Sequence, residues 1–275
     1  MIPHWARNAL ADLLVPRNIL VSQLEVSTLE IPIAGLPAAL DGFTIAHVSD
    51  LHVGSATHWI PRWAPEAADA VRRAKVDVVV NTGDFFWKDP PAAKARAYAS
   101  LFIRADRGVD SHTVNFAILG NHDYYVPLET RRSLTDHLHD SGITVLTNEA
   151  VCLQRGSAGI SLVGLTDEED SFERGLAMLQ TSTRPRIALV HVPDLVEKIP
   201  RGAADLVLAG HTHGGQFTLP FLEQHIVRYG CGSNYVDGLN TINDMPVYIN
   251  RGLGYTGFPV RFRARPEVAL VRLVR

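Results

Sequence analysis

Residues 43–52 read Phe-Thr-Ile-Ala-His-Val-Ser-Asp-Leu-His, an apolar run that stops abruptly in polar side chains. The run is rich in β-branched residues and too short for a helix, so it predicts a strand. Asp50 and His52 fall where this strand ends. In open sheets of parallel strands, reactive side chains gather in the loops beyond the carboxyl ends of the strands. The stretch therefore predicts a strand and, at its end, part of a functional site.

The same pattern returns four times further along the chain. Apolar runs end in Asn81-Thr-Gly-Asp84, in Gly120-Asn-His-Asp123, at His191 and in Gly210-His-Thr-His213. Segments with helical spacing lie between these runs, at residues 65–74, 92–105, 127–140 and 172–180. Strands that alternate with helices indicate a largely parallel sheet covered on both faces.

The second half of the chain also contains strand-like runs without comparable helices between all of them. These runs cover residues 145–153, 160–164, 245–250 and 268–274. They favour a second sheet packed on the first. Because the polar loops come from both halves, we expect one α/β domain over residues 1–275, built as a four-layer α/β/β/α sandwich, with residues 1–40 as an N-terminal helix and strand extension.

Composition excludes several classes of protein. With 26 Lys and Arg against 29 Asp and Glu, the net charge is −3, which gives no reason to expect a specific nucleic-acid partner. The chain has only two cysteines, Cys152 and Cys231, too few for a disulfide scaffold or a four-thiolate zinc site. Cys152 lies on an expected strand and is predicted to be a small buried hydrophobe.

The N-terminal residues and the lengths of the apolar runs bear on where the protein is located in the cell. Charged residues are scattered through the first 25 positions, which argues against a signal peptide, and no run reaches the ~18 apolar residues that span a bilayer. We expect a cytoplasmic protein. An apolar stripe from Trp5 to Ile19 packs either on the body of the protein or, as a peripheral contact, on the inner membrane. The oligomeric state stays open.

The polar side chains at the strand ends form a mixed set of nitrogen and oxygen donors. The set comprises Asp50, His52, Asp84, Asn121, His191, His211 and His213. Such donors suit Mn²⁺, Fe or Zn²⁺ better than Ca²⁺ or a thiolate-bound metal. Seven ligands exceed one tetrahedral site, so the set predicts two divalent ions that share a carboxylate and activate a bridging water to attack phosphorus.

These blocks, taken in their order, resemble the calcineurin-like metallophosphoesterases. The resemblance implies that Asp50, His52 and His213 bind the first metal. It implies that Asn121, His191 and His211 bind the second metal, and that Asp84 bridges the two. Among the candidate ions, we expect Mn²⁺ ahead of Zn²⁺ or Fe.

The resemblance also assigns roles to two residues that are not ligands. His122 would donate a hydrogen bond or a proton to the phosphate oxygen or the leaving group. Asp123 would hold the His122 ring in the required tautomer. Both are therefore expected to be catalytic residues.

A narrower resemblance concerns the segments Gly210-His-Thr-His-Gly-Gly-Gln216, Arg251-Gly-Leu-Gly254 and Pro259-Val-Arg-Phe262. They resemble bacterial small phosphodiesterases of the kind that includes the UDP-2,3-diacylglucosamine pyrophosphatase of lipid A synthesis. Protein serine/threonine phosphatases carry a further arginine motif after the Gly-Asp block, and purple acid phosphatases carry a tyrosine where this chain has Trp87; both branches are therefore disfavoured.

The expected reaction is hydrolysis of a phosphodiester or pyrophosphate bond by a hydroxide that bridges the metals. The substrate is expected to be a small-molecule or lipid-linked phosphoester. The alternative is a UDP-2,3-diacylglucosamine pyrophosphatase that acts at the membrane surface.

The sequence leaves several side chains with two interpretations. Aromatic and apolar residues that follow the first and second blocks either line the mouth of the site or belong to the core; they are Trp59, Ile60, Trp63, Phe85, Phe86 and Trp87. Arg251 and Arg261 either reach a second phosphate or make structural pairs. For His47, a position in the core or behind the ligands is favoured over a role as a metal ligand.

Overall fold

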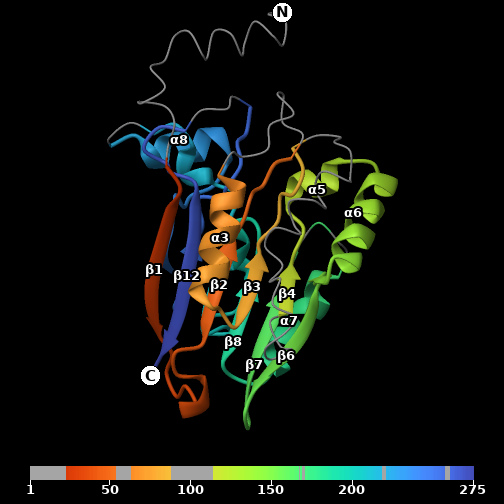
Figure 1. The fold of residues 1–275 in the computed structure, drawn as a ribbon, viewed down its shortest axis with the longest axis vertical. Helices are drawn as coiled ribbons and strands as arrows, with labels where there is room; N and C mark the ends of the chain where they lie inside the picture. Colours follow the sequence, from red (N-terminus) through yellow and green to blue (C-terminus); the bar gives the residue numbers. More distant parts are fainter. Residues whose placement is uncertain are drawn as a thin grey trace, which may run out of the picture.

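The computed structural model describes residues 23–53, 63–87, 114–166, 168, 171–218, 221–257 and 261–275. These residues form two six-stranded sheets that pack face to face, with helices on the outer faces (Figure 1). The predicted four-layer α/β/β/α sandwich is thus confirmed. The helix expected at residues 92–105 and the apolar stripe from Trp5 to Ile19 lie outside the described residues.

The first sheet has the strand order β1-β12-β2-β3-β4-β5. Its strands are β1 (Glu25–Pro32), β12 (Glu267–Val274), β2 (Thr44–Val48), β3 (Val78–Asn81), β4 (Val114–Ala117) and β5 (Ile143–Val145). Strands β2 to β5 run parallel to one another, whereas β12 is antiparallel to β2 and parallel to β1. The carboxyl ends of β2, β3 and β4 therefore lie at the same edge of the sheet.

The second sheet has the order β10-β11-β9-β8-β7-β6. Its strands are β6 (Glu149–Arg155), β7 (Ala158–Gly164), β8 (Arg186–Leu189), β9 (Leu206–Ala209), β10 (Gly238–Ile242) and β11 (Met245–Ile249). The four inner strands are parallel, and the outer strands β6 and β10 each pair antiparallel with a neighbour. The candidate ligands of the second half of the chain follow the carboxyl ends of β8 and β9 in this sheet.

Helices cover the two outer faces. The α-helices are α3 (Ala64–Ala74), α5 (Asn121–Tyr125), α6 (Leu128–Asp140), α7 (Phe172–Thr181) and α8 (Glu223–Gly230), and the 3-10 turns are η1 (Ala38–Leu40), η2 (Pro193–Lys198) and η3 (His213–Gly215). Helices α3 and α6 pack on the first sheet, and α7 and η2 pack on the second. The helices predicted at residues 65–74, 127–140 and 172–180 are therefore confirmed. No helix among the described residues is long and apolar enough to cross a membrane.

Strand β3 shows why these sequences fold as central strands. Val78 and Val80 face the second sheet, whereas Val79 faces the helical layer. A strand that is buried on both faces has no polar side, so its sequence is a continuous apolar run. Each buried valine contributes about 1.5–3 kcal/mol through the hydrophobic effect.

Two runs assigned to the second sheet are placed differently in the structure. The run predicted at residues 145–153 is divided between β5 and β6, which belong to different sheets. The break falls at Asn148, which has a φ of 51° and whose side chain pairs with the backbone N–H and C=O of Thr166 at 3.0 and 2.9 Å. The run at residues 268–274 forms β12 in the first sheet, where it separates β1 from β2.

The prediction that Cys152 is buried is also wrong. Strand β6 lies at the edge of its sheet, and Val151 and Leu153 turn towards the core between the sheets. Because side chains alternate along a strand, Cys152 points the other way and is exposed.

Candidate metal centre

The loops after five strands meet at one end of the sandwich. Asp50 and His52 follow β2, Asp84 follows β3, and Asn121 begins α5 directly after β4. From the second sheet, His191 follows β8, and His211 and His213 follow β9. The sequence-predicted ligands therefore come from both sheets.

The structure brings these side chains together in two groups. Asp50, His52 and His213 offer ligand atoms that all lie within 4.8 Å of one another, and Asp84, His191 and His211 form a second group by the same measure. Asn121 joins the second group, because its Oδ1 lies 3.1 Å from His211 Nδ1.

Asp84 connects the two groups. Its Oδ2 lies 3.4 Å from His52 Nε2 in the first group and 3.1 Å from His191 Nε2 in the second. The Asp84 side chain is almost fully buried. One carboxylate oxygen is thus close to nitrogen atoms of both groups.

Three of the imidazoles are held in a fixed tautomer by backbone carbonyls. His52 Nδ1 donates to Phe86 O at 3.1 Å, His191 Nδ1 to Thr82 O at 2.7 Å, and His211 Nε2 to Cys231 O at 3.0 Å. A carbonyl can only accept, so each of these ring nitrogens carries the hydrogen. In the neutral imidazole the other ring nitrogen presents a lone pair, as in histidines that bind metals.

The second ring nitrogen of His191 faces the Asp84 carboxylate. His191 Nε2 is buried and has no hydrogen-bond partner among the described residues, although Asp84 Oδ2 lies only 3.1 Å away. A positive charge between these two atoms, either a proton on Nε2 or a metal ion, stabilises this approach. The donor set therefore fits divalent metal ions.

His213 is held differently. Arg261 Nη2 donates to His213 Nδ1 at 2.9 Å, and His213 Nε2 lies 2.9 Å from His52 Nε2. Arg261 is fully buried and also donates twice to Gly254 O, at 2.9 and 2.7 Å. Arg251 makes ion pairs with Glu25, Asp237 and Glu267. Both arginines therefore make structural contacts.

The charges of the centre support cation binding. Burial would raise the pKa of Asp50 and of Asp84, but the neighbouring histidines outweigh it, holding the pKa of Asp50 well below its usual range and lowering that of Asp84 to about 2. Burial would lower the pKa of His191, yet Asp84 and Asp50 raise it to about 10, so without a metal ion the imidazole carries a second proton, which a metal ion would displace. Both carboxylates are thus ionised at neutral pH.

The backbone around the centre is strained. Asp50, His52, Asp84, His211 and His213 have φ values of 52°, 45°, 57°, 75° and 53°. Positive φ is costly for residues other than glycine and is concentrated at functional sites. Glycines allow the loops to approach one another: a Cβ on Gly120 would lie 2.2 Å from Asp84 Oδ1. Gly120 was not predicted as a functional residue, although it is the first residue of the block Gly120-Asn-His-Asp123.

His122 lies beside the centre, on α5. Its Nδ1 donates to Trp87 O at 3.2 Å. Both Asp123 oxygens instead accept backbone N–H groups, from Gly120, Phe85 and Phe86, at 2.9 to 3.2 Å. The expectation that Asp123 holds the His122 ring is therefore corrected: the Trp87 carbonyl does so, and Asp123 joins the loop after β3 to the start of α5.

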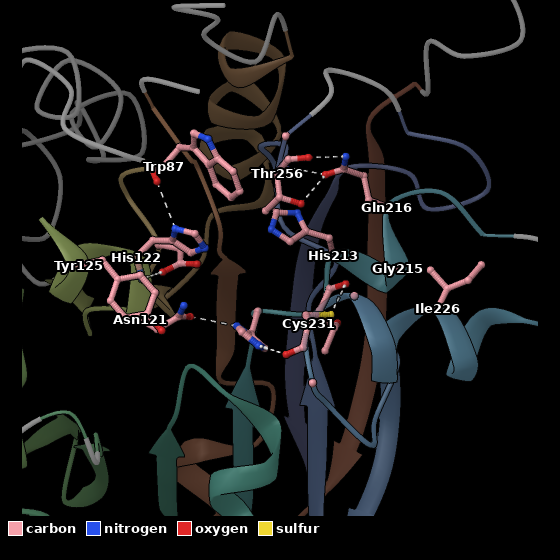
Figure 2. A pocket seen from close by; sticks show the side chains of 16 residues that line it. Trp87, Asn121, His122, Tyr125, His213, Gly215, Gln216, Ile226, Cys231 and Thr256 are labelled. Carbon is pink, nitrogen blue, oxygen red and sulfur yellow. Dashed lines mark hydrogen bonds between the residues drawn. The ribbon is translucent and has the colours of Figure 1, made fainter. Parts of the chain in front are cut away.

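A cavity of about 520 Å³ opens over the centre (Figure 2). Besides Asp84, His211 and His213, it is lined by Trp87, Asn121, His122, Tyr125, Gln216, Ile226, Cys231 and Thr256. In Figure 2, Trp87, His122 and Tyr125 lie together on one side, and Gln216 and Ile226 lie on the other.

For most of the side chains that the sequence left with two interpretations, the structure favours one of the two. Trp63, Phe85 and Phe86 are buried in the core, whereas Trp87 lines the cavity. Trp59 and Ile60 lie outside the described residues. His47 is fully buried and its Nε2 lies 2.9 Å from Thr82 Oγ1, so it is a core histidine behind the ligands.

Comparison with known proteins identifies the family. The calcineurin-like phosphoesterase family matches residues 43–215. The uncharacterized metallophosphoesterase YkoQ of Bacillus subtilis is 29% identical over 237 residues, covering 85% of this chain and 84% of YkoQ. YkuE of the same organism, also an uncharacterized metallophosphoesterase, is 31% identical over 245 residues, covering 86% of this chain and 81% of YkuE.

A third relative carries a more specific name. The phosphodiesterase YaeI of Escherichia coli is 34% identical over 159 residues, which is 58% of each chain. Since the family match spans more than half of this sequence, the chain belongs to the calcineurin-like phosphoesterases. Members of this family are hydrolases that act on phosphoesters.

Proposed function

We propose that this calcineurin-like phosphoesterase hydrolyses a phosphodiester or pyrophosphate bond at a two-metal centre. The observation that carries the proposal is the placement of one ring nitrogen each of His52, His191 and His211, which backbone carbonyls on the opposite ring nitrogens direct towards the same small volume as Asp84. His191 Nε2 supports the proposal, because it is buried without a hydrogen-bond partner among the described residues and lies 3.1 Å from Asp84 Oδ2.

Each candidate ligand has a place in this proposal. Asp50, His52 and His213 would hold one ion, Asn121, His191 and His211 would hold the other, and Asp84 would contact both. Mn²⁺, Zn²⁺ and Fe all suit these donors. When bound, two such cations supply Lewis acidity towards a phosphate and lower the pKa of a water held between them.

His122 supplies the remaining chemistry. Because its Nδ1 donates to the Trp87 carbonyl, its Nε2 is the nitrogen that faces the substrate, and in the imidazolium form it can donate a hydrogen bond or a proton to a phosphate oxygen or leaving group. His122 N also donates to Asp84 Oδ1 at 2.9 Å, which fixes the residue relative to the shared carboxylate.

The lining of the cavity favours a diester over a monoester. Among the described residues that line it, none is a lysine or an arginine. The phosphate group of a monoester carries up to two negative charges, whereas that of a diester carries one. A centre without an added cationic side chain suits the less charged substrate.

The proposal is tested with chromogenic substrates. The purified protein, loaded with Mn²⁺, should hydrolyse bis(p-nitrophenyl) phosphate faster than p-nitrophenyl phosphate, and Asp84→Asn should abolish both reactions. Full occupancy of the metal sites without hydrolysis of either substrate, in Mn²⁺, Zn²⁺ or Fe²⁺, would contradict the proposal.

A second candidate function is hydrolysis of a lipid-linked substrate such as UDP-2,3-diacylglucosamine at a membrane surface. Large apolar side chains lie exposed on and around α8, which lines the cavity through Ile226. Phe217, Phe221 and Tyr229 are 47%, 99% and 77% exposed. Exposed aromatic side chains beside a cavity favour contact with the apolar part of a lipid surface.

The two candidates separate in a vesicle experiment. Under the second, the protein should co-sediment with anionic vesicles and release UMP from UDP-2,3-diacylglucosamine, and Phe221→Ser should weaken sedimentation while hydrolysis of bis(p-nitrophenyl) phosphate is preserved. A protein that hydrolyses the soluble diester but neither sediments nor cleaves the lipid-linked substrate is a soluble phosphodiesterase.

A further inference from the structure

We propose that Trp87 is a positioning residue: its ring and its carbonyl oxygen together hold His122 in the orientation that presents Nε2 to the substrate. This inference rests on the proposed function, because it concerns the group that acts beside the two metals. Trp87 was expected from the sequence only to line the mouth of the site or to lie in the core.

Trp87 contacts His122 in two independent ways. The two rings stack, with centroids 4.6 Å apart and an angle of 25° between their planes. The carbonyl of the same residue accepts from His122 Nδ1 at 3.2 Å. One contact limits tilt of the imidazole plane, and the other limits rotation within that plane. Figure 2 shows both, with the dashed line from Trp87 to His122 beside the stacked rings.

Other contacts of His122 do not replace this support. Tyr125 and His52 meet the imidazole edge-on, at 5.6 and 5.0 Å between centroids. Tyr125 is itself 71% exposed, so it is a weak constraint. His122 is the second residue of the five-residue helix α5, whose backbone fixes the Cα atom but leaves the side chain free to rotate.

Trp87 is in turn anchored by the segment before it. Phe85 and Phe86 are fully buried, and their N–H groups donate to Asp123 at 3.2 and 2.9 Å. Asp123 also accepts from Gly120 N at the start of α5. The Asp123 carboxylate thus fixes Trp87 and His122 relative to each other, although it does not touch the imidazole through a hydrogen bond.

Loss of the ring should lower turnover through His122. Stacking of two aromatic rings is worth enough free energy to change an orientation equilibrium about twofold to tenfold. Trp87→Leu should therefore reduce kcat on bis(p-nitrophenyl) phosphate by about that factor, with KM changed less. Trp87→Phe, which keeps an aromatic face, should restore most of kcat. Neither change removes the carbonyl of residue 87.

A double-mutant cycle tests whether the effect passes through His122. Once His122→Ala has removed the imidazole, adding Trp87→Leu should cost little more, because residues that act as a unit are not additive. Leu239→Ala, which shortens an exposed apolar side chain that does not line the cavity, serves as the control and should leave kcat unchanged. Metal content, measured in every variant, should stay at the wild-type value.

Three outcomes would overturn the inference. Additive losses in the double variant would show that Trp87 acts apart from His122. Loss of metal in Trp87→Leu would show that the ring supports His52, which it also contacts edge-on at 5.4 Å. An unchanged kcat in Trp87→Leu would show that the ring has no such role. An inactive wild type would instead refute the proposed function, so the two failures are distinguishable.

Discussion

Gly252 packs directly against Asp50: a Cβ on this glycine would lie 2.6 Å from the Asp50 Cβ. Gly252 has a φ of 68°, and its N–H and C=O bond Asn250 Oδ1 and Glu267 N at 2.7 and 3.1 Å. The loop after β11 therefore supports a candidate ligand of the first ion, and only a residue without a side chain fits there.

Gly252→Ala should displace Asp50 and lower the metal content of the chain. Gly156→Ala is the matched control, because Gly156 has a φ of 63° but a Cβ there would meet nothing within 4 Å. Both changes strain the backbone, by about 1–2 kcal/mol, and only Gly252→Ala adds a collision. Elemental analysis should show loss of metal in Gly252→Ala alone; equal metal in both variants would refute this account of the loop.

His122→Ala should leave metal binding intact and reduce turnover. The imidazole is not in either group of candidate ligands, and general acid catalysis commonly contributes about 10²- to 10⁴-fold. Elemental analysis together with kcat on bis(p-nitrophenyl) phosphate checks both parts. Loss of metal on removal of this side chain would show that His122 is a ligand.

Arg261→Leu should destabilise the fold by about 3 kcal/mol, because the buried carbonyl oxygens of Gly254 and Ala264 lose their donor. Arg261→Lys should recover little of this, since an ammonium group does not reproduce the planar fork of donors. Urea unfolding of the metal-free proteins measures the difference. A lysine variant as stable as the wild type would show that the fork geometry is not required.

The stability of the metal-free protein should depend on His47 in acid. Burial is the main cause that lowers the pKa of His47 from 6.5 to about 3, with Asp50 opposing the shift. Above pH 6.5 the histidine is neutral in both states, and its contribution is fully present. As the pH falls from 6.5 towards 3, the unfolded chain binds a proton that the folded protein does not, and stability drops by about 1.4 kcal/mol per pH unit.

His47→Gln removes this titration and keeps a donor towards Thr82 Oγ1. Unfolding free energies in the presence of EDTA at pH 7.5, 6 and 5 should therefore fall less steeply for the variant than for the wild type. Parallel curves would show that His47 accepts a proton in the folded state.

The sequence predicts the layers of the fold because central strands are buried on both faces and end in polar residues, as β2 and β3 do. It does not predict where β5 ends and β6 begins, because the turn at Asn148 depends on Thr166, which lies 18 positions later. Nor does it place β12, whose register pairs Glu267 with Glu25 across almost the whole chain. Such distant pairings leave no local pattern in either segment.

The same reasoning applies to the site. Candidate ligands can be predicted because each follows the end of a strand. The residues that support the side chains of the site cannot be predicted in this way. The resemblance to the calcineurin-like metallophosphoesterases implied that Asp123 supports His122. Neighbouring residues on a helix point in different directions, however, and the support comes from Trp87, which is distant in sequence and joins His122 only in the fold.

The central claim is that two cations share Asp84 between the two groups of side chains. Anomalous diffraction from crystals grown with Mn²⁺ tests it most directly. We predict two peaks in each chain, one among Asp50, His52 and His213 and the other among Asp84, His191 and His211, both of them in contact with Asp84. A single peak, or two peaks of which neither contacts Asp84, would contradict the claim.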